Sequence, residues 1–339
     1  MSYTNGLDNP ELYFQAKIYT GNGGTQSITL DGSENMQPDW VWIKRRNSAG
    51  GHMLTDVIRG VTKTIITNEN GAEQTFSNGL TAFGSDGFTV GSEDGFNKAS
   101  DTFVAWNWKA GTSFSNDASA TGIGSIDSAG SVSTTAGFSI IRFSGTGSLG
   151  TVAHGLGAVP HAIFFKRLDA NGAWASYHKP LGATVYMRLD SSSAKITASD
   201  EFNDTEPTST VFTVDTDGGV NASGTNNMIA YCFTNIKGFS KHGGYTGNGN
   251  ANGTFVYTGF KPAWLMVKKT ADVAESWFMY DNKRNAYTGN ERYYVLRANT
   301  TSATNTTYGD NWQVDFLSNG FKWRTTAGHL NNGSFIYMC

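Results

Sequence analysis

A seven-residue segment that occurs three times places the strongest constraint on the fold of this chain. It reads PDWVWIK at residues 38–44, PHAIFFK at 160–166 and PAWLMVK at 262–268. Each copy follows a glycine-rich segment at a similar distance: YTGNG at 19–23, FSGTG at 143–147 and YTGNG at 245–249. Chance does not preserve such a register three times. The sequence therefore predicts three tandem copies of one domain of about 100 residues.

The repeated segment has the composition of a β-strand. Side chains alternate between the two faces of a strand, and here both sets are apolar, so both faces are expected to contact the core. The proline begins the strand, and the lysine ends it where the chain is expected to leave the core. With 41 glycines and only 16% charged residues, the rest of the chain suits short strands and turns. We predict an all-β protein of three antiparallel β-sandwich repeats, of lectin or jelly-roll type.

The repeat sets the expected domain boundaries. An N-terminal arm takes residues 1–15, and its aromatic end could dock on the first domain or on a neighbouring subunit. The remaining segments are repeat one at 16–110, a linker at 111–136, repeat two at 137–235 and repeat three at 236–339.

The linker is predicted from small polar residues with few apolar anchors. A short strand pair across the domain junction is the alternative, supported by Ile123, Ile126 and Val132. Tight hairpin turns are predicted at Asp86-Gly87 and Asn319-Gly320, because both dipeptides favour the positive backbone angles that such turns need.

Charge and hydropathy exclude several classes of partner. A formal net charge of −3 with scattered basic residues argues against a nucleic-acid partner, which needs a basic face. The basic clusters at 44–46, 166–167 and 268–269 are predicted to be solvated strand ends. No apolar run approaches the ~20 residues that cross a bilayer, so membrane insertion is not expected. The first residues also lack the basic start and apolar core of a secretion signal.

No constellation in the sequence predicts catalysis, a cofactor or a metal site. The six histidines include no pair at helical metal spacing, and neither of the two cysteines has a partner at zinc spacing. An exposed acidic loop is predicted at Asp200, Glu201, Asp204 and Glu206, with a cation held by their oxygens as the weaker alternative. The chain is therefore predicted not to be an enzyme.

Two acid–base pairs recur in repeats one and three, Asp56 with Arg59 and Asp281 with Arg284. An ion pair between a loop and a strand end is the simpler interpretation. A carboxylate with an orienting cation at a catalytic site is the alternative. His178 stands at the corresponding place in repeat two.

Aromatic side chains offer the sharpest binding hypothesis. Sugars stack on aromatic faces and hydrogen-bond to Asn, Asp and Gly-rich loops, all plentiful here. The candidate glycan or partner contacts are Trp174, Trp277, Tyr287 and Trp323. A place in the hydrophobic core is the competing interpretation of each, because a sandwich of this size buries its aromatic residues by default.

Several segments together resemble a repeat family of virion structural proteins that is widespread in tailed phages, especially marine ones. They are DNPELYF at 8–14, YTGNG at 19–23, PDWVWIK at 38–44, SDGF at 85–88 and FVAW at 103–106, and repeat three carries the pattern again at 245–249 and 259–264. The resemblance implies lectin-like sandwiches in a virion that is assembled in the host cytoplasm. It carries over no catalytic, cofactor-binding or metal-binding residues.

The expected function is that of a phage virion structural protein, in a tail fibre or at the particle surface, that attaches to a host receptor or glycan. Its expected partners are other virion proteins and a host cell-surface glycan. A symmetric homo-oligomer, with a trimer favoured, is expected for a fibre. A capsid or tail decoration protein that binds only virion neighbours is the alternative, and a polysaccharide depolymerase is a further one.

Overall fold

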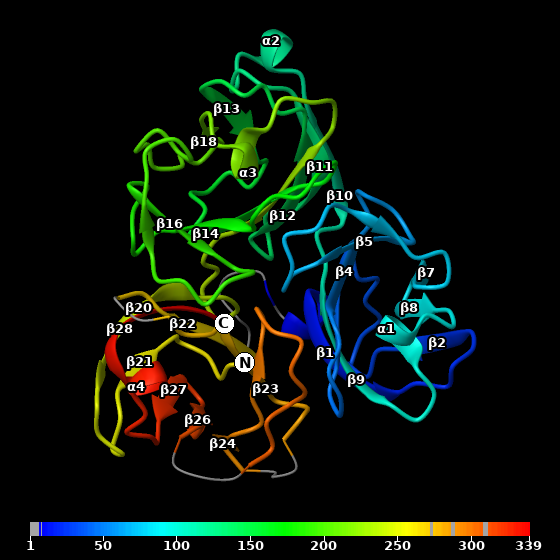
Figure 1. Cartoon of the computed structure of the whole chain (residues 1–339), viewed down its shortest axis with the longest axis vertical. Coiled ribbons are helices and arrows are strands. Elements are labelled where there is room, and N and C mark those ends of the chain that lie inside the picture. The colour runs from blue at the N-terminus through cyan, green and yellow to red at the C-terminus, as the bar shows by residue number, and fades with distance from the viewer. Residues whose placement is uncertain (1–6, 8, 272–273, 286–288, 308–310) are drawn as a thin grey trace.

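The computed structural model describes residues 7, 9–271, 274–285, 289–307 and 311–339. Within these ranges the regular structure consists of antiparallel β-strands with a few short helices. Figure 1 shows three groups of strands, coloured blue to cyan, green, and yellow to red, around a common centre. We call them the first unit (residues 9–110), the second unit (111–235) and the third unit (236–339). The prediction of an all-β fold is confirmed.

The first unit consists of a large and a small sheet. The large sheet has the order β1-β9-β3-β4-β5-β6. Its strands are β1 (Phe14–Thr20), β9 (Thr102–Trp108), β3 (Trp40–Arg45), β4 (His52–Asp56), β5 (Lys63–Ile66) and β6 (Gln74–Thr75). The small sheet has the order β2-β8-β7, with β2 (Gln26–Thr29), β8 (Gly87–Val90) and β7 (Leu80–Gly84). Two short helices, η1 (Pro10–Leu12) and α1 (Asp94–Asn97), precede β1 and β9.

The second unit has a longer large sheet, in the order β10-β11-β12-β19-β14-β15-β16-β17. Its strands are β10 (Thr112–Asn116), β11 (Ser128–Ser133), β12 (Phe138–Phe143), β19 (Met228–Phe233), β14 (Ala162–Arg167), β15 (Ala175–His178), β16 (Val185–Arg188) and β17 (Ile196–Thr197). The small sheet pairs β13 (Gly150–Ala153) with β18 (Val211–Val214). The short helices are α2 (Ala118–Thr121) and α3 (Gly218–Asn221).

The third unit has a large sheet in the order β20-β28-β22-β23-β25. Its strands are β20 (His242–Asn248), β28 (Asn332–Met338), β22 (Trp264–Lys269), β23 (Phe278–Asp281) and β25 (Leu296–Arg297). The small sheet, in the order β21-β27-β26-β24, contains β21 (Phe255–Tyr257), β27 (Gly320–Trp323), β26 (Val314–Leu317) and β24 (Glu291–Arg292). Helix α4 (Gly328–Asn331) leads into β28.

The three large sheets share one arrangement of strands. The shared orders are β1-β9-β3-β4-β5, β12-β19-β14-β15-β16 and β20-β28-β22-β23-β25. The repeated sequence segment supplies the middle strand of each, β3, β14 or β22, and in each of these strands every residue except the last is buried. Burial on both faces, predicted from the uninterrupted apolar run, is confirmed.

The linker predicted at 111–136 needs correction. Residues of this segment form β10 and β11, which pair with each other and, through β11, with β12. They extend the large sheet of the second unit, so the strand-pair alternative describes this region. The small residues of the segment suit this place, because a Cβ on Gly130 would lie 1.9 Å from the carbonyl oxygen of Ile140.

The two hairpins form where they were predicted, with the turn shifted by one residue. Strands β7 and β8 are joined by Ser85 and Asp86, and Gly87 is already the first residue of β8. Gly87 has φ of 120° and lies against the neighbouring strand, where a Cβ would meet the carbonyl oxygen of Ile28 at 2.0 Å. The glycine is therefore needed for close approach of two strands as well as for its positive φ.

The described part of the N-terminal arm docks on its own chain. Asn9 Nδ2 donates to Ser33 Oγ at 2.6 Å, and Glu11 Oε2 accepts from the Ser33 backbone N–H at 2.8 Å. The ring of Tyr13 meets that of Phe239 edge-on, with centroids 6.1 Å apart. The arm thus connects the first unit with the start of the third.

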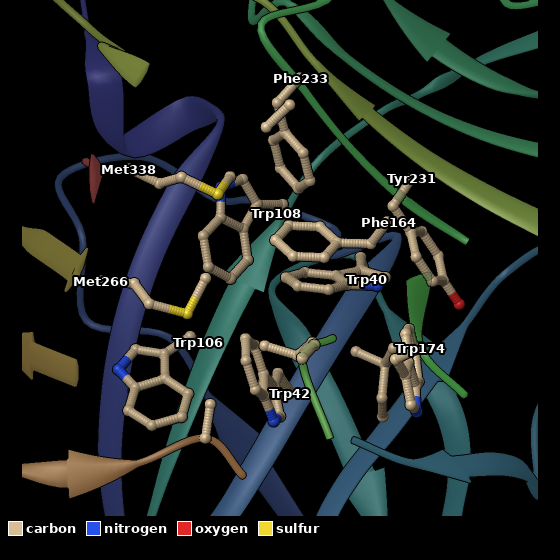
Figure 2. Close-up of a cluster of buried hydrophobic side chains, with 14 of the residues drawn as sticks. Trp40, Trp42, Trp106, Trp108, Phe164, Trp174, Tyr231, Phe233, Met266 and Met338 are labelled. Atoms are coloured by element: carbon tan, nitrogen blue, oxygen red, sulfur yellow. The ribbon is translucent and has the colours of Figure 1, made fainter. Parts of the chain in front are cut away.

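Both faces of each large sheet are covered. One face packs on the small sheet of its own unit, and the other faces the large sheets of the other two units, so that all three contribute to a central core. Figure 2 shows this core with ten labelled residues: Trp40, Trp42, Trp106, Trp108, Phe164, Trp174, Tyr231, Phe233, Met266 and Met338. The three units therefore form one body rather than separate domains along a linker.

Candidate functional site

One end of the central core is closed by three buried lysines that link the units in a cycle. Lys44, Lys166 and Lys268 are fully buried at the ends of their strands. Each Nζ donates to a carbonyl oxygen of its own unit and to one of a neighbouring unit. The acceptors are Gly50 and Thr301 for Lys44 (2.8 and 2.9 Å), Gly172 and Asn70 for Lys166 (2.5 and 3.0 Å), and Glu275 and Ser192 for Lys268 (2.8 Å to Ser192). The prediction of solvated strand ends is wrong for these three residues.

Burial, with no carboxylate bonded to Nζ among the described residues, changes the ionisation of these lysines. Removal from water lowers the pKa of Lys44 to about 7 and that of Lys166 and Lys268 to about 8. Their hydrogen bonds are all to backbone oxygens, which hold the ammonium in place but carry no full negative charge. The three lysines therefore hold the units together at this end of the core.

A second cycle of contacts uses two of the predicted glycan-binding residues. Trp174 and Trp277 are each 1% exposed. Their indole N–H groups donate across units, to Ile66 O at 3.2 Å and Arg188 O at 2.9 Å, and His52 Nε2 lies 3.0 Å from Arg297 O in the same way. Neither ring can stack on a sugar, so the glycan-contact hypothesis is wrong for both.

The other two predicted contacts give no surface platform either. Trp323 is fully buried in the core of the third unit. Tyr287 lies outside the described residues. The competing interpretation, that aromatic residues fill interiors, therefore describes Trp174, Trp277 and Trp323.

The predicted ion pairs form, and both are buried inside the central body. Arg59 Nε lies 2.6 Å from Asp56 Oδ2 and Arg284 Nε lies 2.5 Å from Asp281 Oδ2. Burial alone would raise the pKa of Asp281, but the Arg284 guanidinium holds it below its usual value. Both carboxylates also accept a hydrogen bond from another unit, which explains their burial better than a role in catalysis.

The opposite end of the central core opens into a cavity of about 950 Å³. Trp42, Phe164 and Met266, which occupy corresponding positions in β3, β14 and β22, form its inner wall. The side walls are aromatic and include Trp40, Trp108, Phe233, Phe239 and Trp264. Tyr257 stands at the mouth and is 66% exposed. The volume lies within the range of about 300–1,000 Å³ that is usual for small-molecule sites.

Four of the residues that line this cavity carry buried polar atoms without a hydrogen-bond partner in the described chain. The indole N–H groups of Trp40, Trp42 and Trp264 and both ring nitrogens of His242 are buried and have no partner within the described part of the chain. Burial lowers the pKa of His242 to about 3, so the ring is neutral near pH 7 and offers one donor and one acceptor. Buried polar groups are rarely left without a partner, but each of these nitrogens has less than 1 Å² of accessible surface, so none of them is open to the cavity.

The mouth of the cavity carries an excess of positive charge. Among the described residues that line it are four lysines, Lys237, Lys241, Lys261 and Lys283, and two carboxylates, Glu11 and Asp31. Asp31 already pairs with Lys283 at 3.2 Å and with Lys17 at 3.6 Å. This local excess of lysines over carboxylates contrasts with the net charge of −3 of the whole chain.

Comparison with known proteins places the whole architecture in one family. Residues 9–339 match the family described as Domain of unknown function (DUF7483). The chain belongs to the DUF7483 family. No curated protein and no solved structure matches it significantly.

The acidic loop of this DUF7483 protein is only partly exposed. Asp200 and Asp204 face solvent, as predicted, whereas Glu201 is 3% exposed. Burial, together with the charges of Asp217 and Asp200, raises the pKa of Glu201 to about 7. Glu206 accepts hydrogen bonds from the Tyr177 hydroxyl and from the Ala183 backbone N–H. The loop is thus tied to the second unit by some of its acids.

Two further properties of this DUF7483 chain concern the described residues alone. In that part, no group of three or more His, Cys, Asp or Glu side chains could hold a metal ion. No helix in the same ranges has the length and apolar character that a membrane span requires.

Sequence reasoning missed the cavity although it identified the strands that build it. Trp40 and Trp264 belong to the repeated segment and were assigned to the core, and His242 was given no role. The signal present in the sequence is the alanine, Ala162, that replaces these two tryptophans at the corresponding position of the second unit. A missing indole in one copy indicates that the three units do not close this end symmetrically.

Proposed function

We propose that this chain is a structural protein of a tailed-phage virion that binds a host-surface glycan in its central cavity. The observation that carries the proposal is the cavity itself, a space of about 950 Å³ with aromatic side chains in its lining and the exposed ring of Tyr257 at its mouth. Aromatic faces stack on sugar rings, and the lysine side chains of the lining can donate to the oxygens of a saccharide. The sequence resemblance supports the virion assignment.

Two further parts of the proposal concern the relation between the three units and the oligomeric state of the chain. The three units are interpreted as copies of one domain, which is supported by the shared strand order of their large sheets. We also propose that the chain assembles into a homotrimer, as expected for a fibre, and light scattering of the purified chain tests this. A mass of 36.5 kDa in solution would leave the protein a monomer.

Two measurements test the proposal. Antibodies against the chain, applied to intact phage particles in the electron microscope, are expected to label the tail or the particle surface. The purified chain, applied to an array of bacterial surface glycans and to host cells, is expected to bind at least one glycan.

The alternatives correspond to other outcomes of the same measurements. Binding to capsid or tail proteins, with no binding to any glycan or host cell, would favour a decoration protein. Release of reducing ends from host polysaccharide would favour a depolymerase, and amide substitutions at Asp200, Asp204 and Glu206 would then locate the acids.

A further inference from the structure

We infer that the outer face of the small sheet in the third unit is a stacking platform for a glycan chain, with Phe255 and Tyr257 as its two rings. The inference rests on the proposed function in that the ligand is taken to be a glycan. It adds a second part of the site, outside the cavity, and it requires a ligand of at least two linked sugars.

The two rings project from the same side of strand β21. Phe255 is 43% exposed and Tyr257 is 66% exposed, whereas Val256 between them packs in the core of the third unit. Side chains two residues apart share one face of a strand, so both rings lie on the outer face of the small sheet. Among the described residues, no other aromatic side chain is as exposed as these two.

The corresponding strands of the other two units carry no ring at these places. Strand register aligns the inward residues that lie opposite a phenylalanine, namely Ile28 in β2, Val152 in β13 and Val256 in β21. The residues on either side of the first two are small or polar: Ser27 and Thr29 in β2, and Thr151 and Ala153 in β13. The small sheet therefore folds without rings at these places. Adjacent exposed rings that the fold does not need indicate a binding surface.

Gly320 on the neighbouring strand β27 lets the Phe255 ring lie against the sheet. A Cβ on Gly320 would be 3.0 Å from the nearest carbon of that ring and 2.1 Å from the carbonyl oxygen of Val256. The ring therefore rests on backbone that carries no side chain, and the rest of it faces solvent. A ring held in this way suits stacking on the C–H face of a pyranose.

Polar side chains that are free to bind stand beside the two rings. Lys322 lies opposite Phe255, and Ser318 and Asn319 form the turn that follows Leu317 and leads to Gly320, the residue opposite Tyr257. These three polar side chains make no hydrogen bond or ion pair in the described part of the chain. Ammonium, hydroxyl and amide groups can all bond to the hydroxyls of a sugar that stacks on the rings.

The platform continues into the mouth of the cavity. Tyr257 and Ser318 belong to the cavity lining, whereas Phe255 does not. Residues two apart on a strand are separated by about 6.5 Å, which is more than one pyranose ring spans. One sugar therefore cannot stack on both rings, and the ligand must be a chain of linked sugars.

The size of the platform fits a glycan better than a protein partner. Aromatic side chains bury about 150–250 Å² each, so the exposed fractions of the two rings together correspond to roughly 200 Å². A stable protein interface takes about 800 Å² from each partner. The rings supply only a small part of that area, whereas a chain of a few sugars needs no more.

The test gives the third unit the residues that the first unit has at these two places. The double variant Phe255→Ser, Tyr257→Thr is expected to fold, because the equivalent sheet already contains these residues, and circular dichroism with a melting temperature checks this. The natural chain is applied to an array of bacterial surface polysaccharides and their constituent monosaccharides. It is expected to bind a polysaccharide, and the double variant is expected to lose at least about tenfold in affinity for it. A monosaccharide that binds as tightly as the polysaccharide would overturn the inference.

Single variants show whether stacking is the source of affinity. Phe255→Ala and Tyr257→Ala are each expected to weaken binding of the polysaccharide about tenfold. Phe255→Tyr and Tyr257→Phe keep a ring and are expected to bind within about twofold of the natural chain. The control Leu149→Ala removes a 56% exposed apolar side chain from the second unit and is expected to leave the affinity unchanged.

Phe255 separates this inference from the proposed function, because its ring lies outside the cavity lining. A folded Phe255→Ala variant with natural affinity, next to a weakened Tyr257→Ala variant, would overturn the platform and leave binding in the cavity intact. Loss of binding to capsid or tail proteins in the double variant, with glycan binding unchanged, would also overturn the platform. A natural chain that binds no polysaccharide would overturn the proposed function as well.

Discussion

The hydroxyl of Tyr231 in the second unit donates a hydrogen bond of 2.7 Å to Asp56 Oδ2 in the first. The first unit makes the corresponding contact with the third, from Trp106 Nε1 to Asp281 Oδ2 at 3.0 Å. A third contact of this kind would run from the third unit to the second. Strand register places Met338 at the position of its donor and His178 at the position of its acceptor. Methionine has no hydrogen-bond donor and His178 is not a carboxylate, so neither residue can make its half of this contact.

The Tyr231–Asp56 contact makes the stability of two units interdependent. Tyr231→Phe removes a donor from a buried carboxylate that keeps its ion pair with Arg59, and we expect the free energy of unfolding to fall by about 1.5–3 kcal/mol. Denaturant unfolding with an unchanged m-value measures this. Tyr257→Phe, at an exposed tyrosine, serves as control and is expected to stay within about 0.5 kcal/mol. Equal stability of the Tyr231 variant and the control would contradict the energetic role of the contact.

The buried lysines are expected to make the free energy of unfolding increase with pH. Burial, and then the charge of Arg45, lowers the pKa of Lys44 from its ordinary 10.5 to about 7. Between these two values the folded protein binds fewer protons than the unfolded chain, so the free energy of unfolding increases with pH and this contribution is lost as pH falls through about 7. Unfolding between about pH 7 and pH 9.5 is expected to show a smaller slope for Lys44→Met than for the natural chain. The exposed Lys195→Met should keep the slope; a Lys44 variant that also keeps it would refute the assignment.

A substitution at the buried Trp174 is expected to lower the stability of the chain and to leave its affinity for a glycan unchanged. Trp174→Phe deletes the inter-unit hydrogen bond to Ile66 O and leaves that oxygen without its donor, so we expect a loss of about 1–3 kcal/mol. Because the ring is 1% exposed, affinity for any glycan that the chain binds is expected to stay within twofold. Calorimetry on the folded variant checks the second part. Loss of glycan binding at unchanged stability would restore Trp174 as a surface contact.

The acidic loop predicts a pH dependence of opposite sign. The pKa of Glu201 is raised from 4.5 to about 7 by burial and by the nearby Asp217 and Asp200. The folded state therefore retains a proton that the unfolded chain releases, and this stabilisation, complete below about pH 4.5, is lost as pH rises through about 7. Melting temperatures across this range should fall less steeply for Glu201→Gln than for the natural chain. Identical profiles would show that Glu201 titrates normally, and the exposed Asp204→Asn is the matched control.

Local pattern was enough to predict the repeated strands and the two hairpin turns. The segment around Trp40, its counterparts at Ala162 and Trp264, and the glycine hairpins all follow from the alternation of side chains and from turn chemistry. From the same pattern, Lys44 was predicted to lie in solvent and Trp174 was a candidate for contact with a sugar. A strand reveals that both of its faces are covered, but it does not reveal what covers them.

The sequence by itself determined that this chain is β-rich, that its organising strands are buried on both sides, and that Asp56 and Asp281 pair with the arginines three residues on. Only the tertiary structure decided that the second face of each large sheet is covered by the other two units, which buries the lysines and indoles and leaves a cavity at one end. The physical reason is the separation along the chain of the residues that interact. Strand, turn and ion-pair preferences act between neighbours in the chain, whereas packing of three sheets around one centre depends on residues, such as Lys44 and Thr301, that are more than 250 positions apart.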